Sequence, residues 1–404
     1  MKLPSVKLPS VNLPSVTLRS GRERSLQNFH PWVFSGGVQS LPDCEDGALV
    51  CVRAADGAVL GSGYLNRKSS IIVRMLCFGS ADPREALFEN LERAVALRER
   101  ARDTWLSPSL TNAYRVVNSE GDFVPGLVVD RYDDVLVFQI STLGIERLRD
   151  EIIAWFVKRC APTSIYEKST SGARKEEGLE TREGVIVGQE PDKVLILENG
   201  HEFLVSFRDA QKTGFFLDQR EMRALVGRLS SGRSVLNCFS YTGGFSVYAA
   251  KAGAKKVETV DISVPAIERA KENFTLNDIA LPQHAFSAVD VFDHLREAGD
   301  QFDVVILDPP AFAKRRTHIQ QACKGYSEIN REGIRRTAPG GIVVTSSCSH
   351  FVDEKLFQQV VFQAARDAGR SVRVLGHHLH AFDHPVSIFH PEGAYLKSLV
   401  LGVE

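Results

Sequence analysis

The chain has 404 residues, of which 43% are hydrophobic and 25% charged, and its formal net charge is -1. This length accommodates two to three domains, and the composition is that of a globular protein. A charge balance near zero excludes a global basic field, so any nucleic-acid surface must come from local clusters of Lys and Arg.

The seven cysteines show neither CxxC nor a Cys/His ligand spacing, which argues against a zinc site, and no metal is expected. An odd cysteine count without a secretory segment is typical of a reducing compartment, so a cytoplasmic location is expected. The sequence contains neither a signal-peptide pattern nor an apolar run of roughly 18 residues or more, so no membrane association is expected.

The N-terminal part of the sequence predicts three successive units. Residues 1–16 repeat KLPSV, KLPSV and NLPSV, and the regular prolines predict an extended tail, with a partner-docking peptide as the alternative. Short β-rich runs over 17–80, separated by Gly and Pro turns, predict a small β-barrel. Asp82 followed by Pro83 is typical of a helix N-terminus and predicts a linker helix within 81–111.

The remaining chain predicts two domains of different class. Residues 112–205 contain strand-like runs around one helix at 147–157, which indicates an α+β domain of β-β-α-β-β order. From 206 to 404, strands alternate with helices of 12 or more residues, which predicts a parallel, doubly wound α/β sheet. Its strands are expected at 234–237, 256–261, 302–307, 341–346 and 372–375. Ligands bind such sheets at the carboxyl ends of the strands.

Side chains after the first two strands, and one after a further short strand that precedes Asp290, suit an adenosine. The first strand ends at Asn237, and a loop with Gly243 leads into a helix. Asp261 ends the second strand about 20 residues later, where a carboxylate can accept from ribose hydroxyls. The loop lacks GxGxxG, so NAD or FAD is disfavoured, whereas S-adenosylmethionine (SAM) has no phosphate to bind. A glycine turn that serves only helix packing is the alternative. Asp290 could accept from an adenine amino group, or it could cap the next helix.

The segment FDVVILDPPAFAKRR predicts a buried strand that ends in Asp308, Pro309 and Pro310. Two consecutive prolines make a rigid loop that can hold a planar base, with an acid to bind a ring nitrogen, although a plain turn is the alternative. Lys314 and Arg315 follow and can meet phosphate, or they belong to a solvated face.

The next strand, GGIVVTSSCSH, places Cys348 just beyond its end in a polar setting that suits a thiolate nucleophile. This cysteine suggests a specific reaction. Carbon 5 of cytosine is too weak a nucleophile to accept a methyl group directly. A thiolate that adds to carbon 6 makes carbon 5 enamine-like, and Asp308 would stabilise the ring nitrogen that becomes protonated. A nitrogen-directed methyltransferase needs no such cysteine.

From about Val16 onward the chain resembles the RlmI-type class I methyltransferases, which modify 23S ribosomal RNA at cytosine C5. The segments that carry the resemblance are RERSLQNFHPWVFSG (22–36), YRVVNSEGDFVPGLVVDRY (114–132), QKTGFFLDQR (211–220), NCFSYTGGF (237–245), LDPPAFAKRR (307–316), KGYSEIN (324–330), SSCSH (346–350) and DHPVSIFHPEGAYLK (383–397). The resemblance implies a PUA domain, an EEHEE domain and a Rossmann-like methyltransferase domain, with SAM as cofactor and 23S ribosomal RNA as partner. It also suggests a homodimer. The LPSV repeats are not part of this pattern.

The resemblance also implies residue roles. Those on the cofactor side are Gln219, Arg220, Asn237, Phe239, Gly243, Asp261 and Asp290. Cys348 and Asp308 are implied for catalysis. The residues expected to meet the RNA are Pro309, Pro310, Lys314, Arg315 and Arg22. Arg22 and the His30-Pro31-Trp32 segment belong to the PUA part. Two alternatives stay open: a nitrogen-directed RNA methyltransferase acting on guanine or adenine, and a non-catalytic RNA-binding or assembly protein. An NAD-dependent enzyme is a weaker third.

Overall fold

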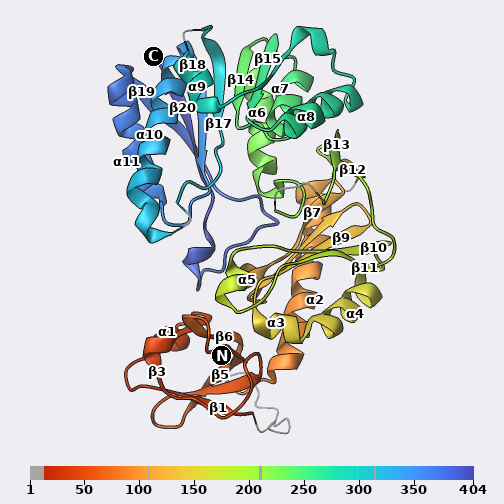
Figure 1. Ribbon diagram of the computed structural model, residues 1–404, viewed down its shortest axis with the longest axis vertical. Coiled ribbons are helices and arrows are strands. Elements are labelled where there is room, and N and C mark those ends of the chain that lie inside the picture. The colour runs from red at the N-terminus through yellow and green to blue at the C-terminus, as the bar shows by residue number, and fades with distance from the viewer. Residues whose placement is uncertain (1–12, 108, 209–211, 298, 314) are drawn as a thin grey trace.

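The computed structural model describes residues 13–107, 109–208, 212–297, 299–313 and 315–404, without the side chains of residues 102 and 103. The predicted RNA contact Lys314 and most of the predicted N-terminal tail lie outside these residues. Figure 1 shows three parts arranged along the long axis: an N-terminal β domain, a middle α+β domain and a C-terminal α/β domain.

The N-terminal domain is built on a six-stranded sheet of order β2-β6-β5-β4-β1-β3. Its elements are β1 (Ser15–Leu18), α1 (Arg24–Gln27), β2 (Trp32–Phe34), β3 (Val38–Ser40), β4 (Leu49–Arg53), β5 (Val59–Leu65) and β6 (Ile71–Phe78). The predicted tail, residues 1–16, extends too far into the domain, because Ser15 and Val16 pair with Cys51 and Val52 of β4. Val16 is fully buried in the core of this sheet, which explains why the last repeat is ordered.

The predicted linker helix is confirmed as α2 (Pro83–Ala101), which is followed by a π-helical turn at Arg102–Leu106. The carboxylate of Asp82 accepts the backbone N–H groups of Arg84 and Glu85 at 2.9 and 3.0 Å, as expected of an N-cap. Leu87 and Leu91 are fully buried on one face of α2, which packs between β6 and the first strand of the middle domain.

The middle domain has a five-stranded sheet of order β11-β10-β9-β8-β7. Its strands are β7 (Ala113–Asn118), β8 (Leu127–Tyr132), β9 (Val135–Ile140), β10 (Ser164–Ser169) and β11 (Arg182–Val187), and its helices are α3 (Leu143–Arg147), α4 (Arg149–Cys160) and α5 (Ala173–Glu176). The predicted β-β-α-β-β order lacks one strand, because three antiparallel strands, not two, precede the helices.

A separate hairpin, β12 (Val194–Glu198) and β13 (His201–Val205), follows this sheet. It is tied to the C-terminal domain through α8 (Val264–Leu276) and the residue after it: Asn273 and Asn277 accept the backbone N–H groups of Leu204 and Glu202 at 2.9 and 3.0 Å. The predicted boundary at 205 therefore separates the hairpin from the domain against which it packs.

The C-terminal domain has a seven-stranded sheet of order β16-β15-β14-β17-β18-β20-β19. The strands are β14 (Ser234–Cys238), β15 (Lys256–Asp261), β16 (Ala285–Ala288), β17 (Phe302–Leu307), β18 (Thr337–Ser347), β19 (Val372–His378) and β20 (Lys397–Val403). The α/β class is confirmed, but the wholly parallel sheet is not. Strand β20 was not predicted, and it runs antiparallel to both β18 and β19.

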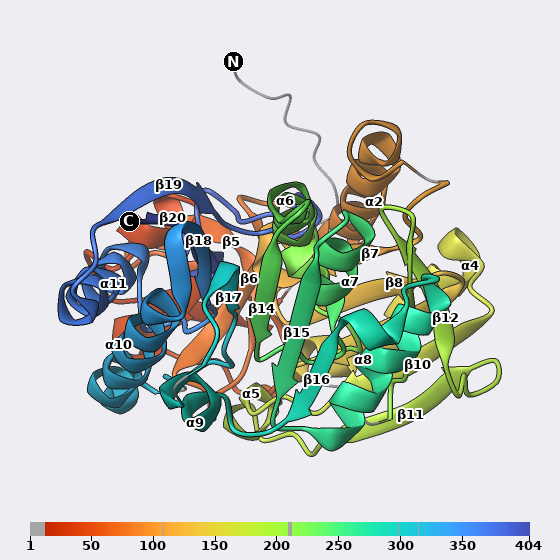
Figure 2. The same cartoon turned by 90° about the horizontal axis from the view of Figure 1, so that it is seen from above.

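Helices cover both faces of this sheet (Figure 2). One face carries α6 (Arg220–Ser230), α7 (Gly244–Lys251) and α8, and the other carries α9 (Val291–Arg296), α10 (Ile319–Arg335) and α11 (Glu354–Ala368). Alternating strand residues supply the two cores: Val235 and Val304 on one side, Leu236 and Val305 on the other. With eight and six residues, α7 and α9 are shorter than predicted. Within the described residues, no helix has the length and hydrophobicity needed to cross a bilayer.

Between β19 and β20, the segment 379–396 leaves the C-terminal domain and reaches the other two domains (Figure 1). In the middle domain, Arg98 donates to the backbone oxygen of Asp383 at 2.7 Å, and Asn118 donates to that of Pro385 at 2.9 Å. The ring of His390 in this segment lies 4.3 Å from the ring of Trp32, which belongs to the N-terminal domain. This segment therefore connects all three domains.

Candidate active site

The carboxyl ends of β14, β15, β17 and β18 meet at a cavity of about 460 Å³. It lies where the strand order reverses between β14 and β17, the position at which doubly wound sheets bind ligands. Six of the residues predicted for catalysis or cofactor binding line it: Gln219, Phe239, Asp261, Asp290, Asp308 and Cys348. Pro309 and Pro310 also line it.

Asp261 shapes the loop on the first side of the cavity. One of its carboxylate oxygens accepts the backbone N–H of Tyr241 at 2.8 Å, and the other accepts that of Ser263 at 2.9 Å. The loop backbone has positive φ angles at Phe239 (57°) and Tyr241 (49°), a conformation that L-residues rarely adopt without support. Asp261 therefore holds a strained loop in place, and its carboxylate retains acceptor capacity toward the cavity.

Asp290 caps a helix, as one of the two expectations for it states, and it also lines the cavity. Its Oδ1 caps α9 by accepting the backbone N–H groups of Phe292 and Asp293 at 2.8 and 3.3 Å. The same residue lines the cavity next to Val291 and Phe292. The cap uses one carboxylate oxygen, so it does not exclude a ligand at the other.

Three residues expected on the cofactor side do not line the cavity. Asn237 is fully buried below the loop and donates to the hydroxyl of Ser246 at 2.9 Å. Gly243 has a φ of 77°, and a Cβ at this position would lie 2.8 Å from the Cβ of Ala270 on α8. The glycine is therefore required for packing of the turn against α8, which was the alternative for this loop.

Arg220 is the third residue that was expected on the cofactor side and does not line the cavity. Its guanidinium is buried and donates to the carboxylate of Asp383 at 3.0 and 3.1 Å, while its Nε lies 3.6 Å from Glu198. One helical turn later, Arg223 lines the cavity instead, held by two 2.7 Å bonds to Glu198 and stacked 4.5 Å from the ring of Phe215.

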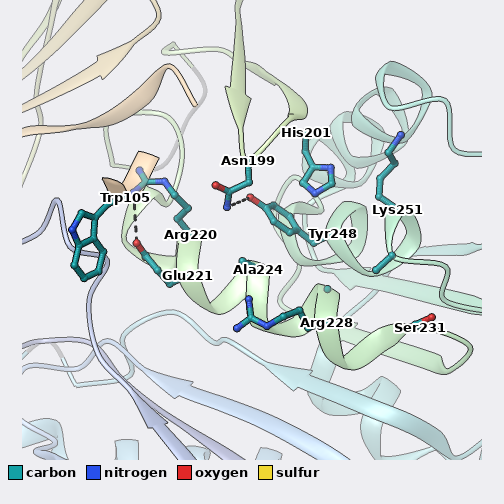
Figure 3. A pocket seen from close by; sticks show the side chains of 12 residues that line it. Trp105, Asn199, His201, Arg220, Glu221, Ala224, Arg228, Ser231, Tyr248 and Lys251 are labelled. Carbon is teal, nitrogen blue, oxygen red and sulfur yellow. Dashed lines mark hydrogen bonds and ion pairs between the residues drawn. The ribbon is translucent and has the colours of Figure 1, made fainter. Parts of the chain in front are cut away.

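A larger cavity of about 670 Å³ lies beside α6, and Arg220 contributes to its wall (Figure 3). Its other walls come from the hairpin, from α7 and from Trp105, which is 65% exposed. Of the predicted site residues that the structure describes, Arg220 alone lines it, so the cavity with Cys348 is the candidate active site.

Asp308 is the half-buried acid at the end of β17. Its Oδ1 accepts the side-chain amide of Gln219 at 3.1 Å. Burial, together with the negative charge of Asp218, raises the pKa of Asp308 to about 7. At neutral pH this group can therefore either hold or release a proton, as a general acid must.

Asp218 and Lys212 also line the cavity, and neither they nor Tyr395, which contacts Asp218, were identified from the sequence. Asp218 accepts the hydroxyl of Tyr395 at 2.5 Å and the ammonium of Lys212 at 3.2 Å. Although burial alone would raise it, the charge of Lys212 and the bond from Tyr395 keep the pKa of Asp218 well below its usual value. Asp218 therefore stays charged while Asp308 titrates.

Cys348 follows β18 and is half-buried, with its Sγ 3.9 Å from the backbone oxygen of Pro309. The residue after it is anchored: the hydroxyl of Ser349 accepts the backbone N–H of Ala313 at 3.1 Å, and its carbonyl accepts the buried ammonium of Lys397 at 2.6 Å. Burial raises the pKa of the Cys348 thiol to about 11, although Lys212 and Lys397 act in the opposite direction. The polar sequence around it had suggested a ready thiolate, but burial keeps the thiol protonated in the free protein.

The residues expected to meet RNA lie in two domains. Pro309 is buried, whereas Pro310 and Arg315 are exposed. Arg22 lies in the N-terminal domain, in a cavity of about 260 Å³ that also contains Trp32 and the exposed Phe34.

Comparison with known proteins decides the family. A protein of Aeromonas salmonicida named ribosomal RNA large subunit methyltransferase I is 42% identical over 387 residues, which cover 94% of this chain and 97% of the relative. Its namesake in Shewanella denitrificans is 42% identical over 393 residues, which cover 95% and 98%. The chain belongs to this family. The resemblance found in the sequence is therefore confirmed.

Two further comparisons support the domain composition of this family member. Residues 183–376 match the model of an S-adenosylmethionine-dependent methyltransferase, and residues 16–78 match that of a PUA-like domain. A structure assigned as a SAM-dependent methyltransferase from Streptococcus mutans has a TM-score of 0.82 at 25% identity, covering 96% of this chain and 99% of its own. A second structure, complexed with SAH, gives the same values.

The cofactor of the family, SAM, fits the cavity. Within the described residues, three buried polar atoms that belong to its lining have no hydrogen-bond partner: Asp218 Oδ1, Gln219 Oε1 and Ser240 Oγ. Buried polar atoms are rarely left unpaired, and the ammonium of a methionine moiety can satisfy acceptors of this kind. The apolar side chains of Phe239, Ile262 and Phe292 supply a wall for a planar base.

Proposed function

We propose that this chain transfers a methyl group from SAM to carbon 5 of a cytosine in 23S ribosomal RNA. The observation that carries the proposal is that Cys348 and Asp308 line the same cavity as the residues suited to SAM. The names of the relatives support a large-subunit ribosomal RNA as substrate. A cytoplasmic location and a homodimer stay predictions.

In the proposed complex, SAM supplies a methyl group on a positively charged sulfonium. Asp261 accepts the ribose hydroxyls and Asp290 accepts the adenine amino group. The unpaired oxygens of Asp218 and Gln219 receive the methionine ammonium. Phe239 covers the cofactor, whereas Arg220, Asn237 and Gly243 act by holding α6 and the glycine turn.

Asp308 is assigned the ring nitrogen of the target cytosine. The Cys348 thiolate forms a bond to carbon 6 while protonated Asp308 gives its proton to ring nitrogen N3. Carbon 5 then bonds to the methyl group, and the methyl–sulfur bond breaks. A general base removes the carbon 5 proton, the Cys348–carbon 6 bond breaks to regenerate the thiolate, and the N3 proton returns to Asp308. The pKa of Asp308 near 7 supports this role, because the group can carry a proton in both directions at neutral pH.

The thiol of Cys348 must lose its proton before it adds. Lys212 and Lys397 already lower its pKa against the effect of burial. The sulfonium charge of the bound cofactor acts in the same sense, because a nearby positive charge favours the thiolate. The proposal thus explains how a protonated cysteine in the free protein becomes reactive in the complex.

The RNA is proposed to enter beside Pro309 and Pro310, whose rigid backbone would contact the extruded base. Phe312, two residues further on, also lines the cavity. Arg315 and Lys314 meet backbone phosphates, and Arg22 of the PUA-like domain holds a flanking part of the RNA.

A covalent trap tests the proposal. RNA transcripts that carry 5-fluorocytidine have no carbon 5 proton to lose, so the enzyme cannot release them after methyl transfer. With SAM present, the wild-type protein is expected to form a denaturation-resistant adduct with such RNA. Cys348→Ala is expected to form none while it still binds SAM. Cys323→Ala, which changes a half-buried cysteine outside the cavity lining, serves as the matched control and keeps the adduct.

The outcome also separates the alternatives. Full methylation of unmodified RNA by Cys348→Ala would favour a nitrogen-directed enzyme, in which the cysteine is a bystander. Absence of SAM binding by the wild-type protein in calorimetry would favour a non-catalytic RNA-binding protein.

A further inference from the structure

Two histidines and a glutamate from opposite ends of the chain come together where the segment 379–396 meets the PUA-like domain. His30 precedes β2, and His390 and Glu392 belong to that segment. Each of the three offers one ligand atom, and these atoms lie within 4.8 Å of one another. None of the three lines the cavity with Cys348, so the cluster has no part in the proposed reaction.

The shortest distances in this cluster fit a tetrahedral metal centre. His30 Nε2 lies 3.4 Å from Glu392 Oε1, and His390 Nε2 lies 3.8 Å from Glu392 Oε2. Ligand atoms that each lie 2.0–2.1 Å from Zn²⁺ in a tetrahedron are separated by about 3.3 Å. Small side-chain rotations would therefore bring the three atoms around one ion.

The second observation is an unsatisfied histidine. His390 is 3% exposed, and within the described part of the chain neither of its ring nitrogens has a hydrogen-bond partner. Glu392 Oε2, which faces it at 3.8 Å, is also buried and unpaired. Buried polar atoms are rarely left unpaired, and a cation between the His390 ring and Glu392 Oε2 would satisfy both at once.

The surroundings would hold such a site in place. The ring of Trp32 packs 4.3 Å from that of His390, and the indole N–H of Trp32 donates to Glu120 of the middle domain at 2.9 Å. Phe29 and Phe389 pack at 5.2 Å beside the cluster. These contacts restrict the orientation of the His390 ring, as supporting residues around metal ligands do.

We propose that His30, His390 and Glu392 bind a divalent transition metal of the Zn²⁺ type, which fastens the PUA-like domain to the methyltransferase domain. Two imidazoles and a carboxylate favour Zn²⁺ over the hard cation Mg²⁺, which prefers oxygen ligands alone. The site is structural, because it joins segments 362 positions apart in sequence and lies outside the active-site cavity.

Binding requires two hydrogen bonds of His30 to be given up, one with Glu392 at 3.4 Å and one with the backbone of Trp32 at 3.3 Å. His30 Nδ1 accepts the backbone N–H of Trp32 at 3.3 Å, which places the proton of the neutral ring on Nε2. A metal on Nε2 displaces that proton, and the ring must turn away from the Trp32 N–H. Both bonds lost are long, and the proton moves from Nε2 to Nδ1 within the neutral ring.

The test uses the full-length protein, freed of metal with a chelator and titrated with Zn²⁺ in a calorimeter. One Zn²⁺ is expected to bind per chain, with an increase in the unfolding temperature, and Mg²⁺ is expected to leave both unchanged. Glu392→Gln keeps the shape of the side chain and is expected to weaken Zn²⁺ binding at least about 100-fold. This loss exceeds the one expected when a residue that only supports a metal ligand is replaced. His390→Ala is expected to do the same.

Glu354→Gln is the matched control, because Glu354 also pairs with a histidine, His377, at 2.9 Å but in an exposed position. This variant is expected to bind Zn²⁺ as the wild type does. The proposal is overturned if wild-type protein and Glu392→Gln bind Zn²⁺ equally. Should either variant misfold, the absorption spectrum of the wild-type protein loaded with Co²⁺ decides: a nitrogen and oxygen ligand set supports the site, and a thiolate-to-cobalt band assigns the metal to a cysteine instead.

Discussion

Replacement of Gly243 by alanine tests whether this glycine serves packing or close approach of the cofactor. Gly243 has a φ of 77°, and an added Cβ would lie 2.8 Å from the Cβ of Ala270 and 3.4 Å from its Cα. The left-handed backbone costs a non-glycine residue about 1–2 kcal/mol. The contact with Ala270 adds about 1–3 kcal/mol of overpacking, because α8 must move away.

Gly232→Ala is the matched control for this prediction. Gly232 has a φ of 69°, and nothing lies within 4 Å of its added Cβ, so this variant carries the backbone strain without the contact. The difference between the two variants is therefore about 1–3 kcal/mol, which corresponds to an unfolding temperature about 2–12 °C lower for Gly243→Ala.

Scanning calorimetry and SAM titration measure the two effects separately. Below its unfolding temperature, Gly243→Ala is expected to bind SAM within a few-fold of wild type, since Gly243 does not line the cavity. Equal unfolding temperatures for the two variants would refute the packing argument. A folded Gly243→Ala protein with SAM affinity reduced by more than tenfold would show that the cofactor approaches this backbone closely.

Three further substitutions test the site. Asp308→Asn is expected to abolish methyl transfer but to stabilise the fold at pH 8 more than at pH 4, as measured by urea unfolding at both pH values. The pKa of Asp308 is raised from 3.8 to about 7, so between these values the folded protein holds a proton that the unfolded chain releases. The stability of the wild-type protein therefore falls as the pH rises through that range, and the asparagine variant lacks this loss. Arg223→Met removes both 2.7 Å bonds to the buried Glu198 carboxylate and leaves it the Tyr248 hydroxyl and Arg220 Nε at 3.6 Å, so it is expected to cost up to about 3–5 kcal/mol in the same assay. Adding Glu198→Gln is expected to recover part of the loss, and a double variant no more stable than the single one would contradict this. Asp261→Asn keeps one acceptor oxygen for the two backbone N–H groups of Tyr241 and Ser263 and is expected to weaken SAM binding at least about tenfold in calorimetry. The exposed Asp278→Asn is expected to leave SAM binding unchanged.

The sequence predicted the parts of the site that depend on regular structure. Asp261, Asp308 and Cys348 each stand at or just after the end of a buried apolar strand, and the parallel order of those strands brings them to one edge of the sheet. Strand β20 escaped notice because its run of seven residues follows a long irregular segment and pairs antiparallel, outside the alternating pattern.

The parts that failed depend on side-chain direction and on long-range contacts. Gln219 and Arg223 are four positions apart and share one face at the start of α6, whereas Arg220 points to a different face. The motif at 211–220 ends at Arg220 and does not include Arg223. Asp218 and Tyr395 meet across 177 positions of sequence, and His30 and Glu392 across 362. No local pattern in the sequence reports such pairs.

Identification of the methylated nucleoside tests the central claim most directly. Large-subunit ribosomal RNA is incubated with the wild-type protein and SAM that carries a labelled methyl group, and the RNA is then digested to nucleosides and analysed by mass spectrometry. The account predicts that the label is found in 5-methylcytidine and that Cys348→Ala yields none. Label in a nitrogen-methylated guanosine or adenosine, formed equally by Cys348→Ala, would contradict it.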